Sequence, residues 1–333
     1  MEKKRRKGIA LTAFTERGRE LASGLAAALG GTLREKDRPL PDWTRESFQS
    51  CEALIFIGAA GIAVRSVAPH LQSKAADPAV ICLDEAGRRV IPLLSGHLGG
   101  ANALAIRLAA LTGGEAVITT ATDVNGRFAV DLWAKRQNMA VLQPERIKNV
   151  SAKILRGETV TVDCPWPVAG AVPELVRPGR DADVVVSYRR LEGGALQLVP
   201  RVLTLGVGCR RGTDAETLAA AFAAFCTERG IVPEAIERAA TIDLKQDEAG
   251  LLAFCASHGW PLRFYSAGEL HAAPGDYTAS AFVKRVTGVD NVCERAAALG
   301  AGKTLIEKKY ARGGVTFALA ERRKDYDWRW RDG

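Results

Sequence analysis

Residues 51–131 read CEALIFIGAAGIAVRSVAPHLQSKAADPAVICLDEAGRRVIPLLSGHLGGANALAIRLAALTGGEAVITTATDVNGRFAVD, and this stretch decides the fold class. Its hydrophobic runs end repeatedly in clusters of Gly, Ser, Thr, His and Asp. The four clusters are GAAG (58–61), LDEAG (83–87), SGHLGGAN (95–102) and TTATD (119–123). Ligands of open α/β proteins bind in loops at strand ends. The stretch therefore predicts an α/β domain with a ligand site in these loops.

The hydrophobic runs in and around this stretch predict individual elements. Strands are expected at residues 8–14, 53–57, 79–83 and 89–94. Helices are predicted over 17–29 and over 99–111, and the second is apolar nearly all round, so we expect it to be buried. The polar segment 35–50 contains Pro39 and Pro41, which predicts a loop with at most one helical turn.

The composition changes twice along the chain, and this predicts its domain organisation. Residues 1–139 form a first α/β domain, and residues 140–200 are rich in Val and Pro and poor in helical pattern. A second α/β domain is expected over 201–322, followed by a polar, solvated tail at 323–333. The predicted fold class is α/β, with two α/β domains of mixed or parallel sheets joined by a small strand-rich middle segment.

Composition excludes several classes of protein. The chain has 333 residues, of which 47% are hydrophobic and 25% charged, as in ordinary globular proteins. No apolar run approaches the roughly 20 residues that span a membrane. Seven cysteines without CxxC spacing and four histidines without an HExxH motif predict reduced thiols in the cytoplasm and no metal centre built by the protein. The net charge of +8 favours an anionic ligand, but no nucleic-acid recognition motif is present.

SGHLGGAN is the sharpest local signal. His97 is the only histidine in a glycine-bracketed loop between a strand and a helix. It fits a general acid/base or a group that hydrogen-bonds substrate, and the alternative is a capping or packing histidine. The following helix offers N–H groups to an anion or a developing oxyanion. Ser95 fits a capping role at least as well as a nucleophilic one. The substrate-binding candidates of this loop are Ser95, Gly96, Gly99, Gly100 and Asn102.

The other loops of the stretch supply weaker candidates. Gly58 and Gly61 lack the spacing of a phosphate-binding loop but permit close backbone approach to a ligand. Arg65 either reaches a carboxylate or is an exposed helix arginine. Asp84 is a candidate acid or base because the adjacent Glu85 is expected to raise its pKa, although turns favour Asp in any case. The polar strand-end candidates, which also fit a capped turn, are Thr119, Thr120 and Asp123.

GVGCRRG, residues 206–212, is the best signal for an anion site. Arg210 and Arg211 precede a helix N-terminus that is already positive, so an anion is expected there. Gly208 permits close approach of a ligand, and Lys245 adds a cation at another strand end. Cys209 is either a reactive thiol or, more commonly, a small packing side chain.

Taken together, these motifs resemble one family. GAAGIAVR, SKAADPAVICLDEAGRRVIPLLSGHLGGAN and VITTATD resemble the N-terminal region of the CbiG family, and GVGCRRGT, ATIDLKQDE and GVDNVCERAA resemble its C-terminal, CobE-like domain. The resemblance covers nearly the whole chain, with residues 140–200 the loosest match. It implies an enzyme of anaerobic cobalamin biosynthesis that opens the δ-lactone of cobalt-precorrin-5A with water and releases acetaldehyde to give cobalt-precorrin-5B.

The resemblance also implies what the protein binds. The substrate is a polycarboxylate tetrapyrrole, which accounts for the basic balance and for Arg65, Arg210 and Arg211. It carries its own cobalt, so no cofactor is expected in the protein. Other enzymes of the cobalamin pathway are the expected transient contacts, and neither nucleic acid nor a membrane is an expected partner.

Local chemistry gives the mechanistic hypothesis. His97, assisted by Asp84 or Asp123, activates water, and backbone N–H groups near Gly99 stabilise the oxyanion. The rival class is a non-catalytic tetrapyrrole-binding or delivery protein. Such a protein is expected to bind a cobalt corrinoid tightly without producing acetaldehyde. A nucleotide-sugar or dinucleotide enzyme would need a phosphate fingerprint that the sequence lacks.

Overall fold

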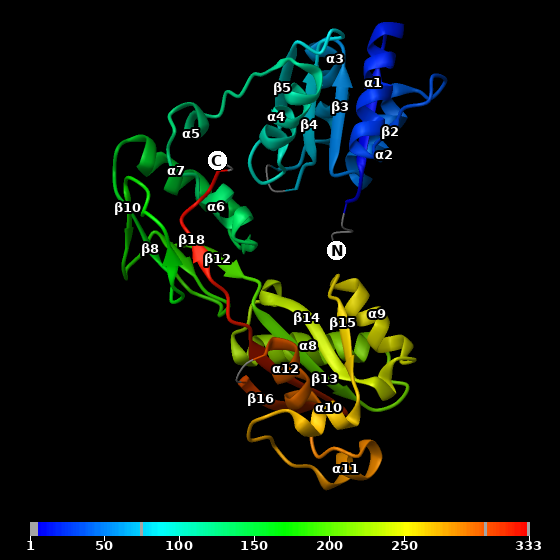
Figure 1. Cartoon of the computed structure of the whole chain (residues 1–333), viewed down its shortest axis with the longest axis vertical. Helices are drawn as coiled ribbons and strands as arrows, with labels where there is room; N and C mark the ends of the chain where they lie inside the picture. Colours follow the sequence, from blue (N-terminus) through cyan, green and yellow to red (C-terminus); the bar gives the residue numbers. More distant parts are fainter. Residues whose placement is uncertain (1–5, 74–75, 303–304, 332–333) are drawn as a thin grey trace. The chain divides into compact units, whose positions relative to one another are not determined.

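The computed structural model describes residues 6–73, 76–302 and 305–331. The chain divides into two compact units, Met1–Leu132 and Trp133–Gly333, which are described separately (Figure 1). Three mixed sheets with flanking helices confirm the predicted α/β fold class. The predicted domain boundaries at 139/140, 200/201 and 322/323 stay predictions.

The first unit is built on a six-stranded sheet in the order β2-β1-β3-β4-β5-β6. All neighbouring strands are parallel except β4 and β5, which form an antiparallel hairpin. The strands are β1 (Ile9–Ala13), β2 (Thr32–Leu33), β3 (Ala53–Ile57), β4 (Ala79–Leu83), β5 (Arg89–Leu94) and β6 (Glu115–Ala116). The four strands predicted for this unit are therefore confirmed.

Helices cover both faces of this sheet. They are α1 (Glu16–Leu29), α2 (Leu40–Ser50), α3 (Ala60–Val67), the 3₁₀ turn η1 (Ala68–His70) and α4 (Ala101–Thr112). The short helix α5 (Ala121–Val124) follows β6. Because side chains alternate along a strand, Ile55 of β3 packs in the core under α1 and α4, whereas Leu54 and Phe56 pack in the core under α2 and α3. Burial on both faces explains why the central strands are continuous hydrophobic runs.

Two predictions for this unit are wrong. The predicted loop 35–50 contains α2, because Pro41 lies in the first helical turn, where its missing N–H is not needed. Trp43 and Phe48 bury one face of α2. Helix α4 is not buried all round, since Ile106 is 58% and Leu111 49% exposed.

The second unit contains a sheet with the strand order β10-β8-β11-β12-β7, in which only β12 and β7 are antiparallel neighbours. Its strands are β7 (Met139–Val141), β8 (Val160–Asp163), β10 (Val176–Pro178), β11 (Val184–Val186) and β12 (Leu196–Pro200). This segment is strand-rich, as predicted. It also contains a helix that the sequence pattern did not reveal, α7 (Ile147–Leu155), preceded by the 3₁₀ turn η2 (Pro144–Arg146).

Residues 323–331 do not form the solvated tail that the sequence predicted. Strand β18 (Tyr326–Asp327) pairs with β9 (Val168–Ala169). Trp328 is 4% exposed and stacks on Trp133 of α6 (Val130–Arg136), with ring centroids 5.1 Å apart. The segment therefore contributes two buried aromatic rings to the second unit, because Tyr326 is 2% exposed.

The second unit also contains the sheet β15-β14-β13-β17-β16. Its strands are β13 (Leu203–Cys209), β14 (Ile236–Ile242), β15 (Leu262–Tyr265), β16 (Leu305–Arg312) and β17 (Val315–Glu321). The accompanying helices are α8 (Ala215–Arg229), η3 (Pro233–Ala235), η4 (Asp243–Lys245), α9 (Ala249–Ser257), α10 (Ala267–Ala272), α11 (Ala281–Thr287) and α12 (Cys293–Ala301). Gly206 lets α12 approach β13 closely, since a Cβ there would lie 1.8 Å from the carbonyl oxygen of Cys293.

Across the described ranges, no helix is both long and apolar enough to cross a bilayer.

Candidate functional site

The loop of residues 95–100 joins β5 to α4 in a tightly folded conformation. Ser95 and Gly100 have positive φ angles of 57° and 88°. A Cβ at Gly96 would lie 2.7 Å from Oδ1 of Asn102, and a Cβ at Gly99 would lie 2.3 Å from Cβ of Ser95. These glycines are required because the loop folds back on itself. The result is a rigid support for His97.

His97 lies between two carboxylates. Its Nδ1 is 3.0 Å from Oδ2 of Asp131, and its Nε2 is 2.7 Å from Oδ2 of Asp123. The side chains of His97, Asp123 and Asp131 are 11%, 20% and 10% exposed. The three residues come from the loop before α4, from α5 and from α6. Asp123 is the most exposed of the three and therefore the most accessible to a ligand.

Asn102, in the first turn of α4, fixes the position of Asp123. Its Nδ2 donates to Oδ2 of Asp123 at 2.8 Å and to Oγ1 of Thr120 at 3.1 Å. The same carboxylate oxygen thus contacts both His97 and Asn102. The structure therefore brings together four of the predicted site residues: His97, Asn102, Thr120 and Asp123.

The two carboxylates change the protonation of His97. Burial alone, the largest influence, would lower its pKa, but the hydrogen bonds and charges of Asp131 and Asp123 outweigh burial and raise it. The imidazole consequently stays protonated to higher pH than a free histidine. The 2.7 Å contact of Nε2 with Oδ2 of Asp123 is one of the interactions that keep the proton on the ring.

The start of α4 is only partly available as an oxyanion site. The N–H groups of Gly100, Ala101 and Asn102 donate to the carbonyls of His97, Ser95 and Gly96 within the same loop. Within the described ranges, no intramolecular acceptor is recorded for the N–H groups of Leu98 and Gly99. The Leu98 and Gly99 N–H groups are therefore among those that this loop leaves for a ligand oxygen.

Asp84 has a different role from the one predicted. Its carboxylate accepts hydrogen bonds from the N–H groups of Ala86, Arg88 and Arg89, and so closes the β4–β5 turn. Burial alone would raise its pKa, but these three bonds lower it. The predicted rise is wrong, because Glu85 instead accepts a hydrogen bond from Thr15 at 2.7 Å.

The remaining candidates of the first unit also have structural roles in this conformation. Ser95 donates through Oγ to the carbonyl of Asp77 at 3.0 Å and does not cap α4, which corrects the capping prediction. Gly58 has a φ of 153° and approaches the ring of Phe14. Arg65 donates to the carbonyl of Gly61 at 3.3 Å. These residues are not among the recorded contacts of His97, and neither is Thr119.

The basic loop before α8 contains its own counter-charges. Arg211 forms an ion pair with Asp247. Glu248 is 4% exposed and accepts from the Gly212 N–H at 2.8 Å and from Nζ of Lys245 at 3.0 Å. Burial alone would raise the pKa of Glu248, but these partners lower it. The carboxylates of Asp247 and Glu248 therefore occupy the position that the sequence predicted for an anionic ligand.

Three further residues in or beside this loop are placed as follows. Arg210 is exposed, and its recorded bonds are made by its backbone. Asp214 caps α8 by accepting from the N–H of Thr217 at 2.6 Å. The thiol of Cys209 is partly buried, and burial raises its pKa, which disfavours a reactive thiolate.

Sequence reasoning missed Asp131. Asp131 lies eight positions after Asp123 and reaches the same histidine because α5 and α6 are short. Its pairing with His97 depends on the path of the chain over residues 124–130, which has no local sequence signature. Among the described residues, no three His, Cys, Asp or Glu side chains are arranged to hold a metal ion.

The fold and this cluster define an α/β protein in which one histidine, on a loop beside the first sheet, lies between two carboxylates. Comparison with known proteins identifies its family. Residues 42–123, 128–221 and 203–320 match the family models described as cobalamin synthesis G N-terminal, cobalamin biosynthesis central region and cobalamin synthesis G C-terminus.

Named relatives extend over most of the chain. Cobalt-precorrin-5A hydrolase of Salmonella typhimurium is 36% identical over 93% of this chain and 97% of its own length. The protein of the same name from Priestia megaterium is 34% identical over 82% of this chain and 79% of its own. Protein CobE of Sinorhizobium sp. is 34% identical over 35% of this chain and 79% of its own. The chain belongs to the CbiG family of cobalamin biosynthesis, and the predicted resemblance is confirmed.

Proposed function

We propose that this protein is a cobalt-precorrin-5A hydrolase, which opens the δ-lactone of its substrate with water and releases acetaldehyde to give cobalt-precorrin-5B. The observation that carries the proposal is the Asp123–His97–Asp131 cluster on a glycine-rich loop, in a chain that belongs to the CbiG family. Lactone opening requires a base for water and a donor for the oxyanion, and the loop offers both.

The His97–Asp123 pair is the proton acceptor in this proposal. Asp131 holds Nδ1, so the imidazole keeps a fixed orientation and its Nε2 faces Asp123. In this proposal the pair accepts a proton from the attacking water. The sequence-based hypothesis named His97 assisted by Asp84 or Asp123, and the contact between His97 and Asp123 supports Asp123 as the assisting acid.

The bonds balance as follows. The water oxygen bonds to the lactone carbonyl carbon, and the N–H groups of Leu98 and Gly99 donate to the resulting oxyanion. The acyl–oxygen bond then breaks and leaves a carboxylic acid and an alkoxide. The alkoxide becomes the carbonyl of acetaldehyde as its carbon–carbon bond to the macrocycle breaks. The electron pair of that bond stays on the macrocycle, which takes up the proton first removed from water.

Cobalt belongs to the substrate in this proposal, and the protein supplies no cofactor. The carboxylate arms of the substrate would bind basic side chains, for which Arg65 and Arg210 are the candidates without a carboxylate partner among the described residues. We propose a cytoplasmic location and transient transfer of substrate and product to neighbouring enzymes of the pathway.

Replacing His97 with Ala tests the proposal. Anaerobic incubation with cobalt-precorrin-5A and a chemical trap for acetaldehyde should show turnover reduced by a factor of about 10² or more. His271→Ala is the matched control, because His271 is exposed on α10. Acetaldehyde release by His97→Ala at the rate of the control would contradict the assignment of His97.

The second candidate is a non-catalytic corrinoid-binding or delivery protein of the same pathway. The exposed cation Arg210 favours it as much as it favours an enzyme, because both need to hold carboxylates. It predicts tight binding of the cobalt corrinoid by the wild-type protein and no acetaldehyde in the trap. The same incubation therefore separates the two functions.

A further inference from the structure

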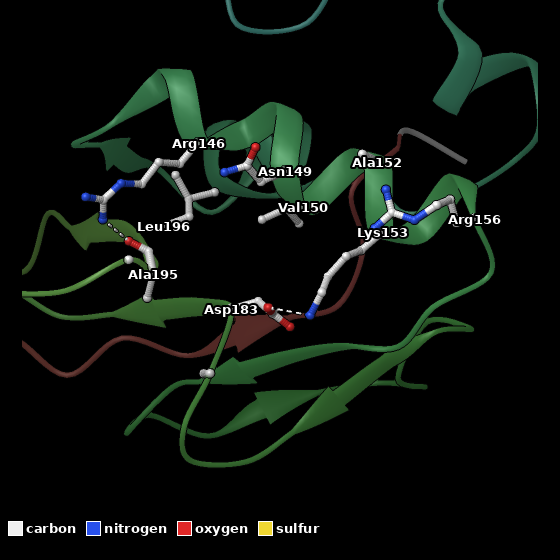
Figure 2. A pocket seen from close by; sticks show the side chains of 11 residues that line it. Arg146, Asn149, Val150, Ala152, Lys153, Arg156, Asp183, Ala195 and Leu196 are labelled. Carbon is white, nitrogen blue, oxygen red and sulfur yellow. Dashed lines mark hydrogen bonds and ion pairs between the residues drawn. The ribbon is translucent and has the colours of Figure 1, made fainter.

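A polar pocket lies in the second unit and is lined by residues between 146 and 196. It has a volume of about 470 Å³ and is bordered by α7 on one side and by residues 182–183 and 194–196 on the other (Figure 2). Its volume is within the range of small-ligand sites. No sequence pattern predicted this pocket, because α7 itself was not predicted.

One face of α7 supplies the polar wall. Arg146, Asn149, Lys153 and Arg156 are spaced by three, four and three residues, so they follow one side of a helix. Ile154, on the neighbouring side, is buried in the core. Figure 2 shows Arg146 near one end of the helix and Lys153 and Arg156 near the other, above the strands.

The charge in the pocket is not balanced. Three cations and one carboxylate line it, so its formal charge is +2. Lys153 donates to Asp183 at 2.7 Å, and Asp183 also accepts from the N–H of Thr161 at 3.1 Å. Asp183 therefore neutralises Lys153 and has little capacity for a second cation. Arg156 pairs with Glu158, which lies outside the lining.

Arg146 is the cation that remains without an acid. Its Nη1 donates to the carbonyls of Gly193 and Ala195 at 2.8 and 2.6 Å. Carbonyl groups orient a guanidinium but do not neutralise its charge. Among the described residues, neither Nε nor Nη2 of Arg146 has a recorded acceptor. An arginine held in this way presents its remaining donors to a planar anion such as a carboxylate.

The opposite wall leaves room for such a group. It contains three small residues, Ala182, Gly194 and Ala195, beside Asp183 and Leu196, and a Cβ added at Gly194 would meet no atom within 4 Å. The pocket is polar and open on this side, which suits a flexible charged arm rather than a flat apolar macrocycle. Val150 supplies the apolar surface against which the methylene groups of such an arm can pack.

We propose that this pocket binds a carboxylate arm of a cobalt tetrapyrrole, with Arg146 as its principal contact and Lys153 and Asn149 beside it. The proposal rests on the proposed function, since the tetrapyrrole of that reaction is a polycarboxylate. The middle segment of the chain thereby acquires a role in holding substrate or product.

Binding by the full-length protein tests the pocket. The probes are cobyrinic acid, a stable cobalt corrinoid with free carboxylate arms, cobinamide, whose arms are amides, and citrate. Isothermal titration should give a Kd for cobyrinic acid that rises about tenfold in Arg146→Gln. The control Lys148→Gln removes the same charge from an exposed position of α7 outside the lining, and its Kd should change about twofold or less.

Arg146→Gln also removes the hydrogen bonds to the carbonyls of Gly193 and Ala195, so a second variant tests the pocket with Arg146 in place. Ala152→Glu places a carboxylate in the pocket while leaving Arg146 unchanged, and it should weaken cobyrinic acid binding by a similar factor. Equal Kd values for cobyrinic acid in Arg146→Gln, Ala152→Glu and Lys148→Gln would overturn the proposal. Citrate binding that depends on Arg146, with no such dependence for cobyrinic acid, would assign the pocket to a small free polycarboxylate and overturn the tetrapyrrole assignment.

Failure of this inference can be told apart from failure of the proposed function. Acetaldehyde release by the wild-type protein, together with identical corrinoid binding by all three variants, would support the hydrolase function and contradict the proposed role of the pocket. Weaker binding in Arg146→Gln, together with no acetaldehyde from the wild-type protein, would support the proposed role of the pocket and contradict the hydrolase function.

Discussion

The two glycine-rich loops, residues 95–100 and 206–212, resemble each other in sequence and differ in what they do with charge. Each follows a strand and precedes a helix. In the first, carboxylates of two short helices contact His97 and raise its pKa. In the second, Glu248 joins the Gly212 N–H to Lys245, while Asp247 pairs with Arg211. The first loop places a histidine between two carboxylates. In the second, acids of the chain pair with Arg211 and Lys245, while Arg210 has no acid partner recorded among the described residues.

The difference shows that a charged loop identifies a ligand site only when its partners are known. A basic loop next to a helix N-terminus predicts an anion, but the chain can supply that anion itself. A histidine paired with carboxylates keeps a titratable proton near neutral pH, which fixed ion pairs of Arg and Lys do not. The following substitutions should therefore affect turnover at the first loop and stability at the second.

Asp123→Asn should have the largest effect. The amide keeps the shape of the side chain but cannot accept a proton, so we expect the rate of acetaldehyde release to fall about 100-fold or more. Asp42→Asn is the control, because Asp42 lies in an exposed ion pair with Arg45 of the same helix. The rates of both variants are measured in the anaerobic trap assay. A rate for Asp123→Asn equal to that of the control would remove Asp123 from the proton-transfer pair.

Glu248→Ala should act on stability instead. It removes the acceptor of the Gly212 N–H and leaves Lys245, whose side chain is 14% exposed, without its acid. We expect the free energy of unfolding to fall by about 2 kcal/mol, measured by urea titration of the second unit's fluorescence. Unchanged stability combined with weaker substrate binding would mean that the basic loop is a ligand site after all.

Asp131→Asn should have a moderate effect on both the turnover rate and the pKa of His97. Loss of the charge beside Nδ1 lowers the pKa of His97, and looser orientation of the ring should reduce turnover about tenfold. Proton NMR titration of the His97 ring measures the pKa directly. A titration midpoint equal to that of the wild-type protein would show that Asp131 does not control His97.

The raised pKa of His97 determines how its ion pairs contribute to the free energy of unfolding as the pH changes. The folded-state pKa of His97 is raised, so its pairs with Asp123 and Asp131 stabilise the fold fully below the unfolded pKa of about 6.5. This contribution is lost as the pH rises through the raised folded value. The stability difference between the wild-type protein and Asp131→Asn should therefore shrink across that interval.

The sequence predicted the sheets better than the helices that flank them. Strands such as β3 are continuous apolar runs because both faces are covered, and their ends agree with prediction. Helix α2 was missed because Pro39 and Pro41 suggest a loop, whereas its amphipathic face becomes apparent only when Trp43 and Phe48 are packed on the sheet. Local propensity is thus overridden by tertiary packing.

For the site, the sequence identified the glycine loop but not the acid that orients its histidine. The spacing in SGHLGGAN reflects steric needs within a few residues, namely the contacts of Gly96 and Gly99. The contact of His97 with Asp131 joins residues 34 positions apart, and no local pattern reports it. The role of Glu248 as a partner of the basic loop was not predicted for the same reason. Glu248 lies 36 positions from Gly212, whose N–H donates to it.

Arg211→Ala should have the smallest effect and gives the sharpest test of the second loop. Arg211 is 71% exposed and its partner Asp247 is 63% exposed, so solvent screens their attraction. We expect the free energy of unfolding to change by less than about 1 kcal/mol, and the KM for cobalt-precorrin-5A to stay near its wild-type value. Thermal unfolding and the acetaldehyde assay measure the two quantities. A large rise in KM with unchanged stability would show that Arg211 leaves Asp247 to bind a substrate carboxylate, and the two glycine loops would then both be ligand sites.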